Sequence, residues 1–345
     1  MRRRIPFAIL LTLILGVATH AQTNPNLRTY FKEYIGLSDD QIAAIRGGQA
    51  FAKNLHSRNG DEIFVFGAVY IKATPESYVK FARDFDRLRS FPGYLAIGQF
   101  SDPPQLSDLK ALTLDSQDMK ELQECKPGDC KIQLPASSIE EVHQSVDWSD
   151  PNAEQVLDEF VRKKMLEHVT AYQQQGNAVL GVYNDKRNPT QVPEQFKYML
   201  SYSQALPKYL PDFYAYLLQY PAAKPPTAEN SFYWARVKFL LKPTVRMVHV
   251  LTLRGDSDIT PAYVIAEKQI YSSHYFQTAL DLTFCVRDDS DPKSTGFYLV
   301  KTMGSEQTGL TGFKGSIVRK VATDRSASSL QKSLATIKDA LEHAP

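Results

Sequence analysis

The run Tyr271-Ser272-Ser273-His274-Tyr275 is the densest group of potentially reactive side chains in the sequence. His274 has the chemistry of a general base or of a hydrogen-bonding group for a ligand, with Tyr271 or Tyr275 as its assistant. The competing interpretation is a polar turn in which the histidine bonds locally. We favour the turn, because one histidine without a placed nucleophile specifies no mechanism.

Two carboxylates on the flanking segments, Glu267 and Asp281, are candidates to orient His274. In regular strands, residues an odd number of positions apart point to opposite faces, so Asp281 and His274 would diverge. The sequence shows no recognisable catalytic triad, phosphate-binding loop or metal-ligand spacing. It therefore predicts no cofactor and no metal site, and it favours a non-enzymatic protein over an enzyme.

Two of the three cysteines flank a turn, in the order Cys125-Lys-Pro-Gly-Asp-Cys130. A Pro-Gly turn lets the chain double back and bring the sulfurs together, so we predict a Cys125–Cys130 disulfide. A redox pair or a metal site is the alternative, but the spacing is not C-x-x-C and no histidine lies close in sequence. Cys285, inside an apolar strand-like run, is expected to be a buried free thiol.

Several aromatic and cationic side chains are candidates to bind a ligand. The segment 206–220 is rich in aromatic residues, which would either line a ligand mouth or pack this segment onto a sheet, and the packing role is favoured. Cations on the strands would hold a carboxylate or a lipid headgroup if they point inward. The candidates are Tyr209, Phe213, Tyr216, Arg236, Lys268 and Phe313. His249, in an apolar strand, is expected to be a hydrogen-bonded core histidine.

The first 21 residues have the pattern of a cleaved export signal. Arg2-Arg3-Arg4 precedes an apolar run from Ile5 to Val17, and Thr19-His20-Ala21 supplies small residues at the cleavage site. The apolar run is shorter than the roughly 20 residues that cross a membrane. We expect an exported protein, periplasmic or extracellular, with no integral membrane span after the signal is removed.

The charge balance excludes a general nucleic-acid binder. The chain has 40 basic and 38 acidic residues. Removal of the signal takes away three arginines, which leaves 37 basic residues and a formal charge near −1. Nucleic-acid binding needs a net basic face that neutralises phosphates.

Hydrophobic periodicity divides the chain into a signal, a first half of mixed elements, a helical insertion and a run of strands closed by one long helix. The boundaries are 1–21 for the signal, 22–60 for N-terminal short helices, 61–134 for the first part of the main domain, 135–230 for the insertion, and 231–345 for an antiparallel meander and its closing helix. Strands are predicted at 49–55, 61–73, 94–100, 108–114, 130–134, 232–241, 245–254, 263–271, 278–287 and 296–303. We expect a helix to begin at Thr74-Pro75-Glu76 and reach Leu88.

This order resembles the helix-grip fold of the START-like superfamily, also called SRPBCC. The resemblance is carried by 63–72 running into Ala73-Thr74-Pro75-Glu76, the strands from Phe232 to Met303, and the helix from Leu310 to Leu341. It implies an α+β fold in which a curved antiparallel sheet wraps the last helix around an apolar cavity. The insertion departs from the family pattern and would act as a lid or as decoration.

The leading functional expectation is an exported binding protein for a hydrophobic small molecule or lipid, held between the sheet and the C-terminal helix. Two alternatives stay open. One is a cyclase- or hydrolase-type enzyme that uses His274 on the same cavity. The other is an envelope protein with a filled core that acts through a protein partner.

Overall fold

The computed structural model describes residues 27–90, 93–239, 242–255, 261–288, 296–307, 310 and 312–343. The predicted signal, 1–21, lies outside them. The strands are β1 (Phe51–Asn54), β2 (Glu62–Ile71), β3 (Tyr94–Gln99), β4 (Val182–Tyr183), β5 (Thr190–Gln191), β6 (Ala228–Phe239), β7 (Lys242–Arg254), β8 (Tyr263–Ser272), β9 (Phe276–Arg287) and β10 (Phe297–Gln307). The α-helices are α1 (Leu27–Thr29), α2 (Asp39–Arg46), α3 (Pro75–Ala82), α4 (Phe85–Arg89), α5 (Ser116–Glu124), α6 (Ala136–Ser145), α7 (Ala153–Gln175), α8 (Val192–Leu200), α9 (Ala205–Tyr209), α10 (Pro211–Gln219) and α11 (Gly312–Glu342).

Eight of these strands form one antiparallel sheet in the order β1-β2-β10-β9-β8-β7-β6-β3. The five consecutive strands β6 to β10 are the predicted meander. The early strand β2 pairs with the last one, β10, so the two halves of the chain share one sheet. The predicted α+β class, with an antiparallel sheet packed against a long C-terminal helix, is confirmed.

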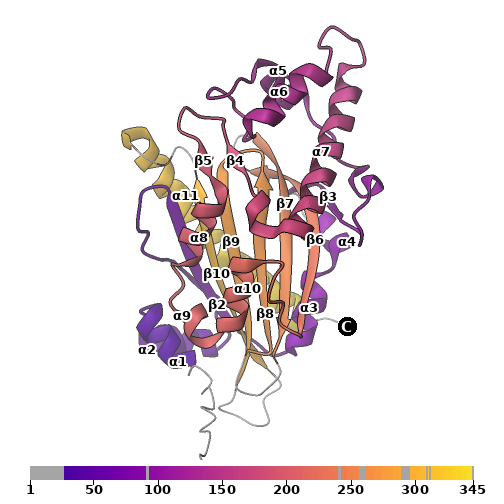
Figure 1. Ribbon diagram of the computed structural model, residues 1–345. Coiled ribbons are helices and arrows are strands. Elements are labelled where there is room, and N and C mark those ends of the chain that lie inside the picture. Colours follow the sequence, from indigo (N-terminus) through magenta and orange to yellow (C-terminus); the bar gives the residue numbers. More distant parts are fainter. Residues whose placement is uncertain are drawn as a thin grey trace, which may run out of the picture.

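The sheet is covered on both faces (Figure 1). On one face α11 packs against β1 and β2, and α3 lies beside it. Alternation along β2 sends Val65 and Val69 to this side and Phe64 and Phe66 to the other. The close approach of α11 requires Gly67, because a Cβ there would lie 2.7 Å from Cδ1 of Leu334.

The insertion helices α7, α8 and α10 cover the opposite face (Figure 1). Their core contains Tyr172, Phe196 and Phe213 together with Met247 and Leu251 of β7. The expectation that the insertion lids a cavity beneath the C-terminal helix is therefore wrong, because the sheet itself separates the two.

Four local predictions also fail. The predicted strand 108–114 is instead a 3-10 helix, Leu106–Leu109, and a loop, because the Asp108 carboxylate accepts backbone N–H groups of Ser101 and Gln105 and so stabilises a turn. The predicted strand 130–134 forms no ladder: the N–H of Cys130 bonds to Asp185 and that of Gln133 to Ser273, two different segments.

The predicted helix from Pro75 to Leu88 divides into α3 and α4, because the Asp84 side chain accepts the Arg87 N–H and starts a second helix. The triplet Lys242-Pro243-Thr244, predicted as a hairpin connection, lies inside β7. Proline is tolerated there because it stands at the beginning of the strand. No helix within the described ranges is long and apolar enough to cross a membrane.

Candidate functional site

A cleft of about 460 Å³ lies between the sheet, α3, α4 and α11. We call it the α11 cleft. Its apolar wall comes from aromatic and aliphatic side chains of α3 and α4 that recur at helical spacing, and from strand residues opposite them. The apolar and aromatic lining residues are Tyr78, Phe81, Phe85, Leu88, Tyr94, Tyr233, Val250, Ile265 and Ile337. Its volume is within the range of small-molecule sites.

The floor of the α11 cleft is charged. Glu267 of β8 and Lys301 of β10 both line it. The hydroxyl of Tyr233 donates to Oε1 of Glu267 across 3.3 Å, and the Lys301 ammonium donates to the Tyr78 hydroxyl. Asp281 of β9 lies directly opposite Glu267, so the two carboxyl groups share the face of the sheet. An apolar cleft with a few polar groups on its floor is the usual form of a ligand site.

These groups perturb one another. Burial raises the pKa of Asp281 to about 6, and the Glu267 carboxylate adds to the effect. Burial alone would lower the pKa of Lys301, but Tyr78, Glu267 and Asp281 outweigh it and raise that pKa above its ordinary value. Burial raises the pKa of Tyr233 well above normal, with Glu267 as a further cause. Perturbed groups of this kind gather at functional sites, although structural networks also produce them.

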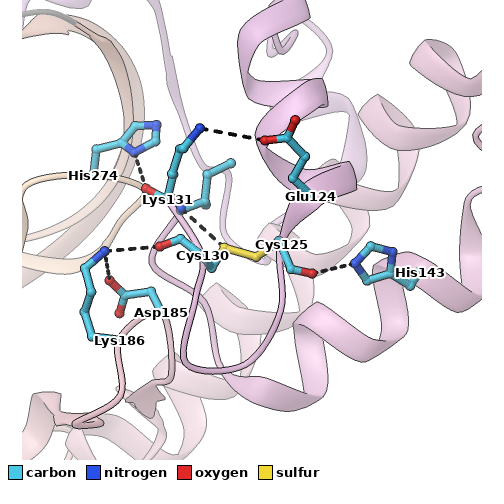
Figure 2. Close-up of a disulfide and its surroundings, with 9 residues drawn as sticks. Glu124, Cys125, Cys130, Lys131, His143, Asp185, Lys186 and His274 are labelled. Atoms are coloured by element: carbon cyan, nitrogen blue, oxygen red, sulfur yellow. Dashed lines mark hydrogen bonds and ion pairs between the residues drawn. A yellow bond between two sulfur atoms is a disulfide. The ribbon is translucent and has the colours of Figure 1, made fainter.

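The candidate His274 and its neighbours lie elsewhere. His274 is buried, and its Nδ1 donates to the Lys131 carbonyl across 3.0 Å (Figure 2). Tyr271 lines a separate apolar pocket of about 150 Å³ beneath α7. Tyr275 adopts a positive φ of 64° in the turn between β8 and β9. Glu267 lines the α11 cleft, Asp281 lies opposite it on the same face of the sheet, and neither orients His274.

Two ligand candidates, Lys268 and Tyr216, occupy the ends of one buried hydrogen-bond chain on the insertion face. Lys268 donates to the Tyr172 hydroxyl (3.1 Å), which contacts Nδ1 of His249 at 3.2 Å. Nε2 of His249 lies 2.8 Å from Oδ1 of Asn230, and Nδ2 of Asn230 donates to the Tyr216 hydroxyl (2.9 Å). Burial holds the pKa of Lys268 well below normal. The prediction of a hydrogen-bonded core His249 is confirmed.

The remaining candidates are dispersed. Phe213 is buried in the core between the insertion and the sheet. Tyr209 lines a small pocket next to α1, and Arg236 pairs with Asp115 at 2.6 Å and with Asp118 at 3.3 Å. The side chain of Phe313 lies outside the described residues. None of the ligand-binding candidates with a described side chain lines the α11 cleft.

Sequence reasoning named Glu267 and Asp281 only as partners of His274 and missed Lys301, Tyr78 and Tyr233 as site residues. The sequence signal that could have found these site residues is the alternation of side chains between the two faces of a strand. Glu267 and Lys268 are adjacent on β8, so one of them must face each side of the sheet. Which side carries a cleft depends on how the helices are distributed.

Both predictions about the cysteines are confirmed. Cys125 and Cys130 form a disulfide that closes the loop after α5 (Figure 2). His143 of α6 donates to the Cys125 carbonyl across 2.8 Å, and Lys186 donates to the Cys130 carbonyl across 3.2 Å. Cys285 is a buried free thiol.

No protein-family model matches this chain, and comparison with curated proteins finds none with significant similarity.

Proposed function

We propose that this protein is exported and binds a small, uncharged amphiphile in the α11 cleft. The observation that carries the proposal is the combination of an apolar wall with a floor of hydrogen-bonding groups at Glu267, Lys301 and Tyr233. The wall would hold the hydrocarbon part of the ligand by burial of apolar surface. The floor would bind its polar end.

The charges around the cleft favour an uncharged head group. Two arginines also line it, but Arg83 pairs with Glu229 at 2.6 Å and Arg87 donates to the Phe81 carbonyl across 2.7 Å. Lys301 and Arg246 supply two positive charges to the electrostatics around Asp281, and Glu267 and Asp281 supply two negative ones. A charged head would leave one of these groups without its partner in a partly buried site, which is costly. A hydroxyl, ester or amide donates to the carboxylate or accepts from the ammonium without changing that balance.

The arrangement of the sheet and α11 supports a relationship to START-like proteins as part of the proposal. α11 closes tightly onto β1 and β2 at Gly67, while the cleft lies toward β6, β7 and β8. The cavity would therefore occupy only one half of the sheet. Export is supported by the basic and apolar pattern of 1–21 and by the disulfide, a bond that persists mainly in oxidising compartments.

The two alternatives receive less support from this geometry. His274 is not among the lining residues of the α11 cleft, so an enzyme that uses His274 there lacks its base. A filled core that acts only by protein contacts does not account for a cleft of about 460 Å³.

Filling the cleft tests the proposal. Val250 lines it, whereas Val156 is exposed on α7. Val250→Trp and Val156→Trp therefore make the same change at a cleft position and at a control position. With the neutral fluorophore N-phenyl-1-naphthylamine as probe, we expect saturable binding by the wild type and by Val156→Trp, and at least tenfold weaker binding by Val250→Trp. Thermal unfolding of all three proteins is the control that checks that each is folded.

Native mass spectrometry of the purified wild type supplies a second measurement. We expect adducts that organic extraction removes and that mass spectrometry identifies as uncharged amphiphiles. An adduct-free mass together with equal probe affinity in Val250→Trp and wild type would overturn the proposed function.

A further inference from the structure

A second group of buried polar side chains lies at the end of the sheet near α5, away from the α11 cleft. Asp118 and Glu121 are three residues apart and share one face of α5. His274 approaches them from the turn between β8 and β9. One donor atom from each of these three residues lies within 4.8 Å of the other two. Asp118 is 6% exposed, Glu121 5% and His274 4%, so water contributes little to their solvation.

Each carboxylate uses one oxygen for a cationic neighbour. Oδ2 of Asp118 lies 3.3 Å from Arg236, and Oε1 of Glu121 accepts from Lys242 and from Gln117. The other oxygens point to the histidine or have no partner. Oδ1 of Asp118 is 3.5 Å from Nε2 of His274, and Oε2 of Glu121 has no hydrogen-bond partner among the described residues. An orphaned buried carboxylate oxygen is costly, so its position requires an explanation.

The orientation of His274 also leaves a buried atom without a partner. Its Nδ1 lies 3.0 Å from the Lys131 carbonyl, which only accepts, so Nδ1 carries a hydrogen (Figure 2). In the neutral ring this leaves a lone pair on Nε2, and within the described part of the chain Nε2 has no hydrogen-bond partner. A lone pair facing a carboxylate oxygen is unfavourable without a cation between them. Histidines that bind metals commonly donate their other N–H to a backbone carbonyl in this way.

We propose that Asp118, Glu121 and His274 bind one divalent cation of the zinc class. Zinc bonds of about 2.0–2.2 Å at a tetrahedral angle place two ligand atoms about 3.4 Å apart, and the structure has 3.5 Å between Nε2 of His274 and Oδ1 of Asp118. One imidazole and two carboxylates suit Zn²⁺ or Mn²⁺. Arg236 and Lys242 hold the remaining carboxylate oxygens and fix the ligand orientation.

Three protein ligands leave a coordination position for water or for a bound molecule, as in open zinc sites. Asp118 also lines the apolar pocket of about 150 Å³ beneath α7, together with Tyr271 and Ser273. This pocket offers the cation an entry path. The site is independent of the α11 cleft, so its failure and the failure of the proposed function are separable.

Calorimetric titration of the tag-free wild type with ZnCl₂ and MnCl₂, after dialysis against EDTA, tests the proposal. We expect one cation per chain, with a dissociation constant of Zn²⁺ below about 10 μM. His274→Gln and Glu121→Gln should weaken Zn²⁺ binding at least tenfold, because even loss of a group that only orients a ligand typically costs about 10–100-fold in metal affinity. His143→Gln is the matched control. His143 is exposed beside the Cys125–Cys130 disulfide, and its ring donates to the Cys125 carbonyl.

Co²⁺ provides a readout that needs no variant. The wild type should take up one equivalent with the visible absorption of a low-coordinate N/O site, and Zn²⁺ should abolish that absorption. Absence of saturable uptake by the wild type would identify the cluster as an imidazolium–carboxylate ion pair and would overturn the proposal. Equal affinities for wild type and the folded His274→Gln and Glu121→Gln variants would also overturn it, because binding would then be at another place.

Discussion

Glu267 lies directly opposite Asp281 across the β8–β9 pair, and both side chains are on the face of the sheet that α11 covers. Like charges in directly opposed positions destabilise a sheet. Here Lys301 and Arg246 compensate, and burial together with the Glu267 carboxylate still raises the pKa of Asp281 to about 6. The sheet thus keeps an unfavourable pair at the floor of its cleft, which is the pattern expected of a site shaped by binding.

Glu267→Gln tests the coupling between the two carboxyl groups. Removal of the neighbouring negative charge should lower the pKa of Asp281 below 6, because the ionised form then meets less repulsion. The measurement is a carbon-13 NMR titration of the Asp281 carboxyl group. A pKa that stays at about 6 in the variant would show that burial alone sets it.

The same variant should change head-group preference. With Glu267 neutralised, the positive charge of Lys301 is less compensated, so an anionic amphiphile gains relative to an uncharged one, by up to about tenfold. Competition of decanoate and decanol against N-phenyl-1-naphthylamine measures the ratio. Lys301→Met instead removes the positive charge and should disfavour decanoate. Identical decanoate-to-decanol affinity ratios in both variants would contradict the assignment of these groups to the polar floor.

Asp281 also makes stability depend on pH. Its folded pKa of about 6 lies above the ordinary value of about 3.9, so the folded state binds the proton more tightly than the unfolded state. Between these pH values stability must fall as pH rises. Relative to Asp281→Asn, the wild type should lose about 1–3 kcal/mol of unfolding free energy from pH 4 to pH 7. Urea denaturation measures this difference.

Asp339→Asn, an exposed change on α11, is the matched control for this titration. Glu306, whose pKa burial raises to about 7, titrates in every one of these proteins and cancels in the comparison. A stability difference between wild type and Asp281→Asn that does not vary with pH would contradict the raised pKa.

Most of the sheet could be predicted from sequence because its determinants are local. The meander strands are separated by polar turns, and Thr74-Pro75-Glu76 begins a helix by capping, where the Thr74 hydroxyl accepts the Ser77 N–H. The candidate site was harder, because helices cover both faces of the sheet and its strands are apolar on each side. Alternation then separates Glu267 from Lys268 without telling which one faces the cleft.

The cluster near α5 could not be predicted for a different reason. Asp118 and His274 are far apart in sequence, and their contact depends on how the loop after α5 crosses the end of the sheet. The segments on either side of α5 were predicted as strands, 108–114 before it and 130–134 in the loop after it, and such strands would have directed these side chains elsewhere. The disulfide was predictable because a short Pro-Gly loop brings its cysteines together by local geometry alone.

Lys268 gives a pH dependence of the opposite sign. Burial lowers its pKa well below normal, so the folded state binds the proton less tightly than the unfolded state. As pH rises toward the ordinary lysine value of about 10.4, the wild type should gain stability relative to Lys268→Met, by up to about 1.4 kcal/mol per pH unit. Urea denaturation between pH 7 and 10 measures it. Lys332→Met, exposed on α11, should show no such trend.

Removal of the disulfide tests whether the loop after α5 supports the proposed cation site. Cys125→Ala/Cys130→Ala opens a short loop, so the chain-entropy estimate for the loss of unfolding free energy is about 2 kcal/mol. The carbonyl that accepts from His274 belongs to Lys131, the residue after Cys130. A freer loop should hold the imidazole less firmly, and Zn²⁺ affinity should fall about tenfold while binding of N-phenyl-1-naphthylamine in the α11 cleft is unchanged.

The double variant, and the wild type after reduction with dithiothreitol, should behave alike, because both lack the same bond. Since Cys285 is buried, the folded wild type should present no reactive thiol to a disulfide-exchange reagent before reduction, and unfolding should expose one. Equal loss of Zn²⁺ and fluorophore binding in the double variant would indicate global unfolding. Selective loss of Zn²⁺ binding is the result that ties the disulfide loop to His274.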